Sequence, residues 1–532
     1  MPAETPSNVT EARDDRMPPG VPYIVSNEFA ERFCFYGINA ILSVYMVQFL
    51  HYGDAKATSW QSLFKFAAYF FPLVGAIVSD VFWGKFRTII TFSMAYVLGC
   101  SILALGPPSP LTLGVGLGFM AFGTGGIKPC VSTNVGDQFT SKNQHLIERA
   151  FSYFYLSINA GSSISIYFCP VLLNNYGPKA AFGMPAAMMA VATLVFWMGR
   201  KRFAVVPPAG KQWLRDIVSP EGLRLVGRLL ILLVFIAGFW ALWDQSNGQT
   251  WTLQATSDLM DKTLWPGYTL LPAQIQVVNG LLILMMVPIF TFGIYPLAGR
   301  FFTVTPLRKI GVGMFVAALS FLIVASIEKK IQNGIGVSVW WQLLAYVVLT
   351  ASEVLVSITA LEFFYKQAPL RMKSFIMALY LCAIAFGNLA TAVVNNAMVR
   401  ELPGSTAVAG SETWVSLPTG ISVVTGQKID FDNSGLIVHT ADGKLAPLAG
   451  TFLASEVHGN RIRLMDNEHR RPVSTTGEWN ASGAQVSTYR LVGPEYFNFF
   501  AYMMAALGVV FIGVAMAYRE KTFVRVDEAS AH

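Results

Sequence analysis

Twelve long apolar segments dominate this 532-residue chain and restrict what it can fold into. A helix needs about 20 mostly apolar residues to cross a lipid bilayer. We therefore predict an all-α membrane protein with twelve transmembrane helices. Their predicted ranges are 22–50, 57–79, 88–106, 111–136, 149–171, 180–199, 225–247, 270–299, 309–327, 338–365, 373–398 and 493–518.

The composition excludes an ordinary soluble enzyme, a disordered chain and a secreted disulfide scaffold. Hydrophobic residues make up 54% of the chain and charged residues 13%, whereas soluble domains have about 25% charged residues. All five cysteines lie inside apolar segments, so we expect them to be small buried side chains. The net charge of +7 is spread between the segments, which argues against a nucleic acid as a partner.

Basic residues between the segments predict the orientation in the membrane. Lysine and arginine are enriched in cytoplasmic loops. Loops after even-numbered segments are the richer ones, as Arg200, Lys201 and Arg202 after the sixth segment illustrate. We therefore expect both termini in the cytoplasm. The chain would be integral to the plasma membrane, or to the inner membrane of a Gram-negative bacterium.

A basic stretch and a polar stretch divide the chain into units. The basic stretch separates two groups of six segments, as expected for two helical bundles. The polar stretch has short alternating runs such as ISVVTGQKIDF, which predict a small β-rich extracytoplasmic insert. The expected units are a tail (1–20), a six-helix bundle (21–199), a linker (200–224), helices seven to eleven (225–398), the insert (399–492), helix twelve (493–518) and a tail (519–532).

Seven of the ionisable residues inside predicted membrane helices are the informative ones, and each costs roughly 2.5–3.5 kcal/mol on insertion scales. Such residues usually face a cavity or a charged partner. The N-terminal half has three cations and two carboxylates among them, and the C-terminal half has two carboxylates. A cavity between the halves would be bipolar and would suit a zwitterion. The seven residues are Glu28, Glu31, Arg32, Lys65, Lys128, Asp244 and Glu353.

Carboxylates beside a membrane cavity can also carry protons. A carboxyl group near a cation can take up a proton on one side of the membrane and release it on the other. One charge that moves through 100 mV gains about 2.3 kcal/mol, which is an adequate driving force. Proton coupling is thus plausible on physical grounds, and sodium coupling stays open.

Five motifs, in the expected order over about residues 26–390, resemble those of the proton-dependent oligopeptide transporters. This family lies within the major facilitator superfamily. The first motif resembles the ExxERFxYYG pattern of its first helix. The matching stretches are EFAERFCFYG (28–37), GAIVSDVFWGKFRTI (75–89), FSYFYLSINAGS (151–162), FWALWDQSNGQTWTLQA (239–255) and ASEVLVSITALEFFYKQAPLRMKS (351–374).

The resemblance implies the major facilitator fold and inward symport of di- and tripeptides, and of peptide-like molecules, with protons by alternating access. Glu28, Glu31 and Arg32 would form the proton-coupling motif. Lys128 would meet the peptide carboxylate and Glu353 the peptide amino group. The other substrate-binding residues would be Tyr36, Asn39, Tyr69, Asn159, Trp240, Asp244, Asn279, Ser357 and Tyr380, with Asp244 available for a salt bridge across the halves.

The resemblance also implies that the proton gradient is the energy source, that no cofactor or metal is needed, and that the protein functions as a monomer. The chain departs from the family at several positions. Phe35 replaces one tyrosine of the first motif, and Asn39 stands where many members have arginine. The latter change places more of the carboxylate recognition on Lys128. Tyr380 stands where bacterial members usually have tryptophan.

Two alternatives stay open at this point. The substrate could be nitrate or another small solute of the same family, although a retained Glu353 opposite Lys128 favours a substrate with an amino end. The protein could also be a receptor that binds peptides without moving them. An enzyme is disfavoured, because the sequence has no histidine or cysteine cluster at metal spacing and no nucleophile–base constellation.

Overall fold

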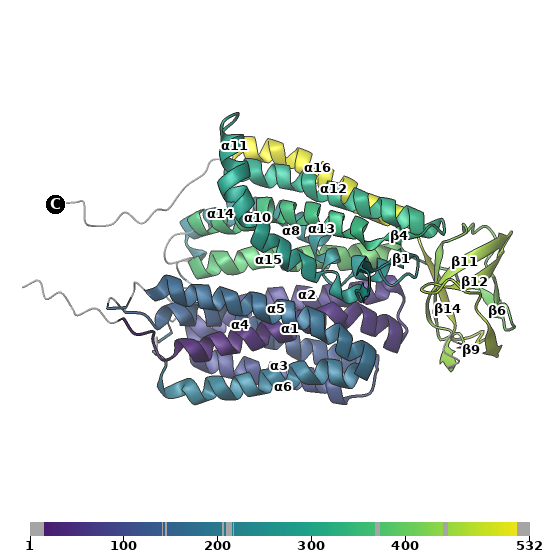
Figure 1. Ribbon diagram of the computed structural model, residues 1–532, viewed down its shortest axis with the longest axis horizontal. Coiled ribbons are helices and arrows are strands. Elements are labelled where there is room, and N and C mark those ends of the chain that lie inside the picture. The colour runs from purple at the N-terminus through teal and green to yellow at the C-terminus, as the bar shows by residue number, and fades with distance from the viewer. Residues whose placement is uncertain are drawn as a thin grey trace, which may run out of the picture.

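Two bundles of long helices and a β-rich insert make up the protein, as the computed structural model in Figure 1 shows. The structure describes residues 15–518, except 141, 144–145, 205–206, 209–214, 216, 368–372 and 440–444. Within these residues, twelve helices are long and apolar enough to cross a membrane. The predicted fold class is therefore confirmed, including the β-rich insert.

The N-terminal bundle consists of six helices that lie along one another in the lower half of Figure 1. A short π-helical turn, η1 (Val78–Trp83), extends the second helix, and η3 (Gly199–Lys201) ends the sixth. The six helices are α1 (Val21–Leu50), α2 (Asp54–Ile77), α3 (Lys85–Leu105), α4 (Pro110–Asp137), α5 (Ile147–Tyr176) and α6 (Pro178–Met198).

Glycines of α4 let its backbone lie close to α2 and α3. A Cβ at Gly125 would overlap Phe71 of α2, and a Cβ at Gly126 would overlap the ring of Phe92 in α3. Small residues permit this kind of close approach between membrane helices. The glycine-rich segment therefore serves packing within the N-terminal bundle.

The C-terminal bundle also has six membrane spans, and three of them are built from consecutive helical pieces. The first span continues from α8 (Pro220–Trp243) through η4 (Asp244–Ser246) to α9 (Thr250–Gln254). The others comprise η5 (Pro272–Gln274), α10 (Val277–Pro288), η6 (Ile289–Ile294) and α11 (Tyr295–Gly299), then α13 (Val339–Glu353), η7 (Val354–Ile358) and α14 (Thr359–Gln367). The remaining three spans are the long helices α12 (Pro306–Gln332), α15 (Lys373–Met398) and α16 (Pro494–Ala517).

Proline starts five of the long helices, which fits a residue with fixed φ and no N–H to leave unpaired. These are α4, α6, α8, α12 and α16. A serine or threonine hydroxyl before three of these prolines accepts a backbone N–H of the first turn. The three capping residues are Ser109, Ser219 and Thr305.

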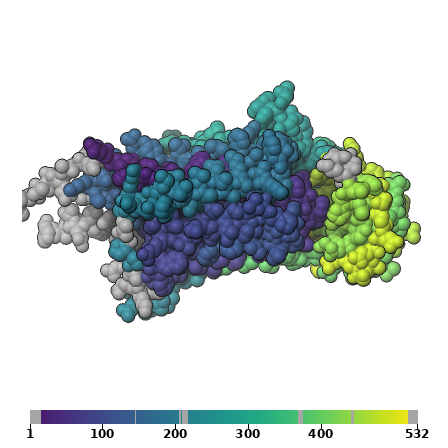
Figure 2. Space-filling model, turned by 90° about the horizontal axis from the view of Figure 1, so that it is seen from below, coloured from purple at the N-terminus to yellow at the C-terminus, as the bar shows by residue number. Residues whose placement is uncertain are grey.

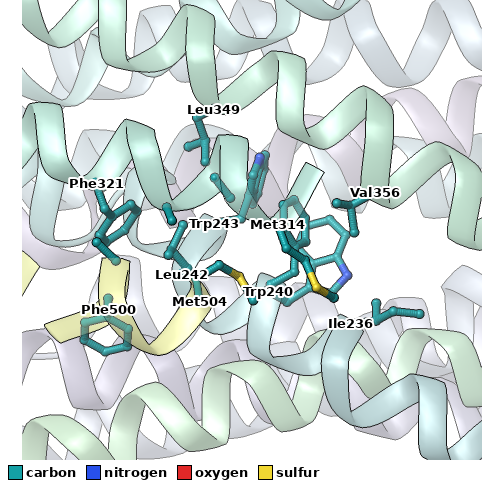
Figure 3. Close-up of a cluster of buried hydrophobic side chains, with 14 of the residues drawn as sticks. Ile236, Trp240, Leu242, Trp243, Met314, Phe321, Leu349, Val356, Phe500 and Met504 are labelled. Atoms are coloured by element: carbon teal, nitrogen blue, oxygen red, sulfur yellow. The ribbon is translucent and has the colours of Figure 1, made fainter. Parts of the chain in front are cut away.

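Tryptophans of α8 lie in the core of the C-terminal bundle, as Figure 3 shows. Trp240 and Trp243 pack edge to face, with ring centroids 5.1 Å apart. Met314 of α12 and Met504 of α16 belong to the same buried cluster. The core thus fixes the end of α8 against its neighbours.

Short strands connect some of the C-terminal helices at the end of the bundle near the insert. Strands β1 and β4 pair in parallel, and β2 and β3 form a hairpin. Their bounds are β1 (Met260–Asp261), β2 (Thr263–Trp265), β3 (Tyr268–Thr269) and β4 (Val337–Ser338).

The insert between α15 and α16 folds into two antiparallel sheets. The larger has the strand order β5-β14-β8-β11-β12-β7-β6, and the smaller has the order β10-β9-β13. The strands are β5 (Val399–Glu401), β6 (Thr406–Val408), β7 (Trp414–Ser416), β8 (Lys428–Asp432), β9 (Leu436–His439), β10 (Leu445–Pro447), β11 (Gly450–His458), β12 (Arg461–Asp466), β13 (Thr475–Gly477) and β14 (Gln485–Tyr489).

Alternation of apolar and polar residues gives the insert its own core. In β8, Ile429 and Phe431 are buried, while Lys428, Asp430 and Asp432, which alternate with them, are partly exposed. A two-residue Gly459–Asn460 turn joins β11 and β12, and Gly459 adopts a φ of 62°. Glycine suits such tight hairpin turns. In Figure 2 the insert caps one end of the helices.

The two bundles meet mainly along α2 and α15. These helices lie side by side in the middle of Figure 1.

Candidate functional site

A cavity of about 250 Å³ lies between the two bundles. Helices α1 and α5 form one wall, and α8, η4, α10 and α13 form the other. At one end of the cavity, Tyr155 and Ile358 are exposed, whereas at the other end Ser246 and Tyr346 are buried. The cavity therefore opens away from the insert and is closed toward it.

Glu353 presents a carboxylate to this cavity from the end of α13. Its Oε2 accepts hydrogen bonds from Trp243 Nε1 at 3.0 Å and from Asn279 Nδ2 at 2.9 Å. Among the described residues, no hydrogen bond reaches its Oε1. Two neutral donors thus hold one oxygen, and the other is free to accept a bond from a ligand.

A second group of charges lies on α1, where Glu28 and Glu31 share Arg32. Arg32 Nε lies 2.7 Å from Glu28 Oε1 and 2.9 Å from Glu31 Oε2. Thr124 of α4 donates a hydrogen bond to Glu31. Both carboxylates are buried, and the positive charge of Arg32 offsets part of their desolvation through contacts of its Nε with each of them.

Lys128 of α4 has an unusual environment. Its Nζ lies over two aromatic rings, 3.8 Å from the centroid of Phe35 and 4.0 Å from that of Tyr69. This ammonium is buried and makes no hydrogen bond within the described part of the chain. Cation–π contacts stabilise it only in part, because a buried charge also requires hydrogen-bonding partners.

A buried ion pair joins the two bundles. Lys65 Nζ of α2 lies 3.0 Å from Asp244 Oδ1 and 2.9 Å from the carbonyl oxygen of Asn247. Asn388 of α15 donates a hydrogen bond to the other oxygen of Asp244 at 2.6 Å. The exposed fractions of the Lys65 and Asp244 side chains are 1% and 4%. Water therefore does not screen this pair. The ion pair connects α2 directly to the C-terminal bundle.

Further hydrogen bonds between the bundles lie on the side of the cavity nearer the insert. Asn39 Nδ2 of α1 donates to the backbone oxygen of Asn247 at 3.1 Å, and Ser43 donates to that of Gly248 at 2.6 Å. Gln61 Nε2 of α2 donates to both oxygens of Asn39. These bonds and the Lys65–Asp244 pair form what we call the seam.

Only some of the residues predicted for substrate binding line the cavity. Four of them do so: Tyr36, Asn159, Asn279 and Glu353. Asn39 and Asp244 lie in the seam instead. The others lie outside the cavity lining and have the following neighbours: Tyr69 is beside Lys128, Trp240 packs on Trp243, and Ser357 bonds to Tyr380 at 3.3 Å.

Two important residues were missed as site residues. Trp243 was not singled out, although its place three residues after Trp240 puts it near the same face of α8. Lys65 was recognised as a membrane charge, but its partner was not identified. Two features of the sequence pointed to this ion pair. The N-terminal half has one more cation than carboxylates in its membrane helices, and Asp244 has no cation near it in the sequence of its own helix.

The chain is similar to proteins of known family. The sequence profile described as the POT family matches residues 86–219 and 211–415, which together span more than half of the chain. The chain belongs to the POT family. Three of the five motifs, at 151–162, 239–255 and 351–374, lie inside the matched residues.

Members of the POT family from animals share substantial identity with the chain. Solute carrier family 15 member 2 of Danio rerio is 38% identical over 359 residues, which is 58% of this chain and 50% of that protein. Peptide transporter family 1 of Drosophila melanogaster is 37% identical over 375 residues, which is 61% of this chain and 50% of that protein. The chain thus spans about half the length of the curated relatives it matches.

Solved structures of the POT family share the fold. The POT family transporter PepTSo has a TM-score of 0.72 and 28% identity, covering 94% of this chain and 99% of that one. A crystal structure of a proton dependent oligopeptide (POT) family transporter has a TM-score of 0.61 and 35% identity, covering 70% and 91% of the two chains. The two-bundle architecture of the chain is thus that of POT transporters.

Proposed function

We propose that the protein imports di- and tripeptides together with protons by alternating access of its two bundles. The observation that carries this proposal is the cavity between the bundles, which Glu353 lines with a carboxylate of which one oxygen has no hydrogen-bond donor among the described residues. Membership of the POT family, the Drosophila relative named Peptide transporter family 1 and the similar proton dependent oligopeptide (POT) family transporter support the same substrate class.

Glu353 is proposed to bind the amino group of the peptide. A carboxylate in a membrane cavity needs a cationic partner or several donors to offset its desolvation. A peptide ammonium would supply that partner at Oε1. Every peptide has an amino end, so this anchor would not restrict the side chains that the cavity accepts.

Lys128 is proposed to bind the carboxylate of the peptide. Its buried ammonium makes no hydrogen bond within the described residues, and an anion would satisfy it. Phe35 and Tyr69 lie directly against this ammonium, and Tyr36 of the cavity wall contacts Phe35, with ring centroids 5.5 Å apart. A small shift of these rings would let a carboxylate in the cavity reach Lys128.

The α1 cluster is proposed to carry the proton. Glu28 and Glu31 share a single guanidinium, so protonation of one would leave the other fully paired with Arg32. Arg32 and Tyr36 are four residues apart and lie on one face of α1. The cluster is thereby connected to the cavity wall through α1.

Closure of the seam indicates which state the structure represents. With the insert outside and both termini in the cytoplasm, as we propose, the cavity faces inward. Outward opening would require Lys65 and Asp244 to separate, together with the other bonds of the seam. We propose that a single chain performs this cycle in the plasma membrane.

Uptake of dialanine into proteoliposomes tests the proposal. Glu353→Gln is expected to lower uptake about tenfold or more, because a charge-assisted hydrogen bond is lost. The control Glu362→Gln changes an exposed carboxylate on the same span and should transport like the native chain. Lys128→Ala is also expected to impair uptake. Dialanine binding without uptake would favour a receptor, and uptake of nitrate but not of dialanine would favour a small-solute transporter.

A further inference from the structure

Trp243 contacts the proposed amino-group anchor from a rigid position. Its indole lines the cavity, and the side chain is 9% exposed. Figure 3 shows it within the buried cluster at the end of α8, where Trp240 packs against its ring. The indole has few alternative orientations, so the direction of its N–H is fixed by packing.

The hydrogen bond from Trp243 determines how Glu353 can bind a ligand. Trp243 Nε1 and Asn279 Nδ2 both donate to Oε2, and Asn279 also donates to Thr350 Oγ1 at 3.0 Å. Asn279 is therefore shared, whereas the indole N–H of Trp243 has Glu353 as its acceptor. The Trp243 bond thus keeps Oε2 occupied and leaves Oε1, which no described residue bonds, for a ligand in the cavity that Glu353 lines.

We infer that Trp243 is the positioning residue that makes the site selective for a free amino end. This inference rests on the proposed function. It predicts that the loss of the indole N–H weakens binding of a peptide ammonium more than binding of a blocked peptide. If Trp243 served only in packing, loss of its indole N–H would weaken the binding of both peptides to the same degree.

Binding of dialanine and N-acetyl-dialanine to the purified full chain tests this inference. Trp243→Phe keeps an aromatic ring and removes the N–H. It should weaken dialanine binding about tenfold, the usual effect of losing one hydrogen bond to a charged group. Binding of N-acetyl-dialanine should change much less. The matched control is Trp251→Phe, since the buried Trp251 Nε1 has no hydrogen-bond partner within the described residues and Trp251 does not line the cavity.

The outcomes separate this inference from the proposed function. A native chain that prefers dialanine over the acetylated form, together with an unchanged preference in Trp243→Phe, would overturn the role of Trp243 alone. A native chain that binds both peptides equally would overturn the role of Glu353. A native chain that binds neither would overturn the proposed function and this inference with it.

A second, independent observation concerns how the insert meets the N-terminal bundle. Helix α2 begins after Gly53, which has no side chain to cap its free N–H groups. The insert supplies the missing acceptors. The N–H of Asp54 donates to Thr451 Oγ1 at 2.9 Å, and the N–H of Ala55 donates to Tyr489 Oη at 3.2 Å.

Asp430 of the insert orders both capping groups. Thr451 Oγ1 donates to its Oδ1 at 2.8 Å, and the hydroxyl of Tyr489 donates to its Oδ2. A Cβ at Gly53 would collide with this carboxylate, so α2 and Asp430 are in direct contact. Lys428 of β8 adds an ion pair with Asp54, with Nζ 2.6 Å from Oδ2.

The insert is also attached to the C-terminal bundle. It is covalently joined to α15 and α16, and the backbone N–H of Asp258 donates to the carbonyl of Glu468 at 2.9 Å. His469 Nδ1 lies 2.8 Å from Asp258 Oδ2. The insert therefore bridges the outer ends of both bundles, above the seam.

We propose that the insert is a clasp that caps α2 and so restrains the two bundles from separating at this end. Separation would have to break the two capping hydrogen bonds and the Asp54–Lys428 ion pair. This proposal does not depend on the identity of the substrate, because it concerns contacts between parts of the same chain.

Labelling of a cysteine in the boundary between the bundles tests the clasp. Ser59 is buried and donates to Asn396 of α15 at 3.0 Å, so a reagent can reach Ser59→Cys only when the bundles separate at this end. The five native cysteines are buried, and the chain without Ser59→Cys gives the background rate for N-ethylmaleimide in detergent.

Removal of the capping hydroxyls should accelerate labelling. Tyr489→Phe or Thr451→Val in the Ser59→Cys chain is expected to raise the rate severalfold. Thr451→Ser keeps the hydroxyl and should label at the native rate, as should Thr476→Val, which changes an exposed threonine of the smaller sheet. Equal labelling of Tyr489→Phe and the parent chain would overturn the clasp, as would faster labelling of Thr476→Val to the same degree.

Discussion

Charged side chains within the bundles differ in how completely they are paired. The Lys65–Asp244 pair has a cation, an anion and additional hydrogen bonds from Asn388 and to Asn247. The ammonium of Lys128 lies over two aromatic rings and has no hydrogen-bond partner within the described residues. We interpret the Lys65–Asp244 pair as a structural connection across the seam. We interpret Lys128 as a group that binds an anionic ligand.

Breaking the Lys65–Asp244 pair on one side should destabilise the protein. Lys65→Met leaves the buried charge of Asp244 without its cation, which costs about 3–5 kcal/mol. The double variant Lys65→Met/Asp244→Asn should recover most of this loss. Thermal unfolding in detergent measures the stability of the single and the double variant. Lys366→Met, which breaks an exposed pair with Glu362, is the control and should change stability by less than about 1 kcal/mol. A Lys65→Met chain as stable as the native one would contradict the pairing.

Asp430 should make the insert more stable in acid than at neutral pH. Burial and the nearby charge of Asp54 raise its pKa to about 6, against hydrogen bonds from Tyr489 and Thr451 and the charge of Lys428. The ordinary pKa of an aspartate is about 3.9, so the folded state binds more protons than the unfolded state between about pH 4 and 6. Stability therefore falls as the pH rises through this window and levels off above it.

Asp430→Asn should remove this dependence. The difference in melting temperature between the native chain and Asp430→Asn is expected to favour the native chain more at pH 4.5 than at pH 6.5. Thermal unfolding in detergent at a series of pH values measures this difference. A constant difference across the window would show that Asp430 titrates at its ordinary pKa.

Helix α4 illustrates at the element scale how small residues determine packing. Gly126 has no room for a side chain, because a Cβ would overlap the ring of Phe92. Gly118 on the same helix has no atom within 4 Å of a Cβ placed there. These two glycines offer a matched pair of substitutions.

Gly126→Ala should destabilise the N-terminal bundle by about 1–3 kcal/mol, the usual cost of overpacking a core. Gly118→Ala should leave stability unchanged or raise it, since alanine favours the helix. Melting temperatures of the purified variants measure both effects. Equal destabilisation by the two substitutions would contradict the close packing of α4 on α3.

Elements were easier to predict from the sequence than their contacts. Segments of about 20 apolar residues identify membrane helices without knowledge of their neighbours, and period-two alternation identified strands in the insert. The residues of the site were placed by family motifs. Asn39, however, could not be assigned to the seam from sequence, because its partners Gln61 and Asn247 depend on how α1, α2 and η4 pack together. For Asp244 the family resemblance implied a salt bridge across the halves, but the sequence did not identify its partner Lys65, which is 179 positions away.

The insert was predicted as β-rich, but its two sheets and its contacts with α2 could not be predicted. Strand order depends on pairing between distant segments, as β14 with β5 shows. The capping of α2 by Thr451 and Tyr489 likewise joins residues about 400 positions apart in sequence. Local sequence patterns contain no information on such pairs.

At the scale of the whole molecule, the structure combines one closed end with one open end. The seam and the insert lie at the closed end, and the cavity with Glu353 opens at the other. This arrangement is what alternating access requires of one state of the cycle. The complementary state would close around Tyr155 and Ile358 and open beyond Lys65 and Asp244.

The central claim is that a proton gradient drives peptide uptake through this cavity. The most direct measurement is dialanine accumulation in proteoliposomes with and without an inward proton gradient, for the native chain, Glu31→Gln and the control Glu362→Gln. We expect gradient-driven accumulation by the native chain and the control, and none by Glu31→Gln. Uptake that is indifferent to the gradient, or Glu31→Gln that accumulates dialanine like the native chain, would contradict the account.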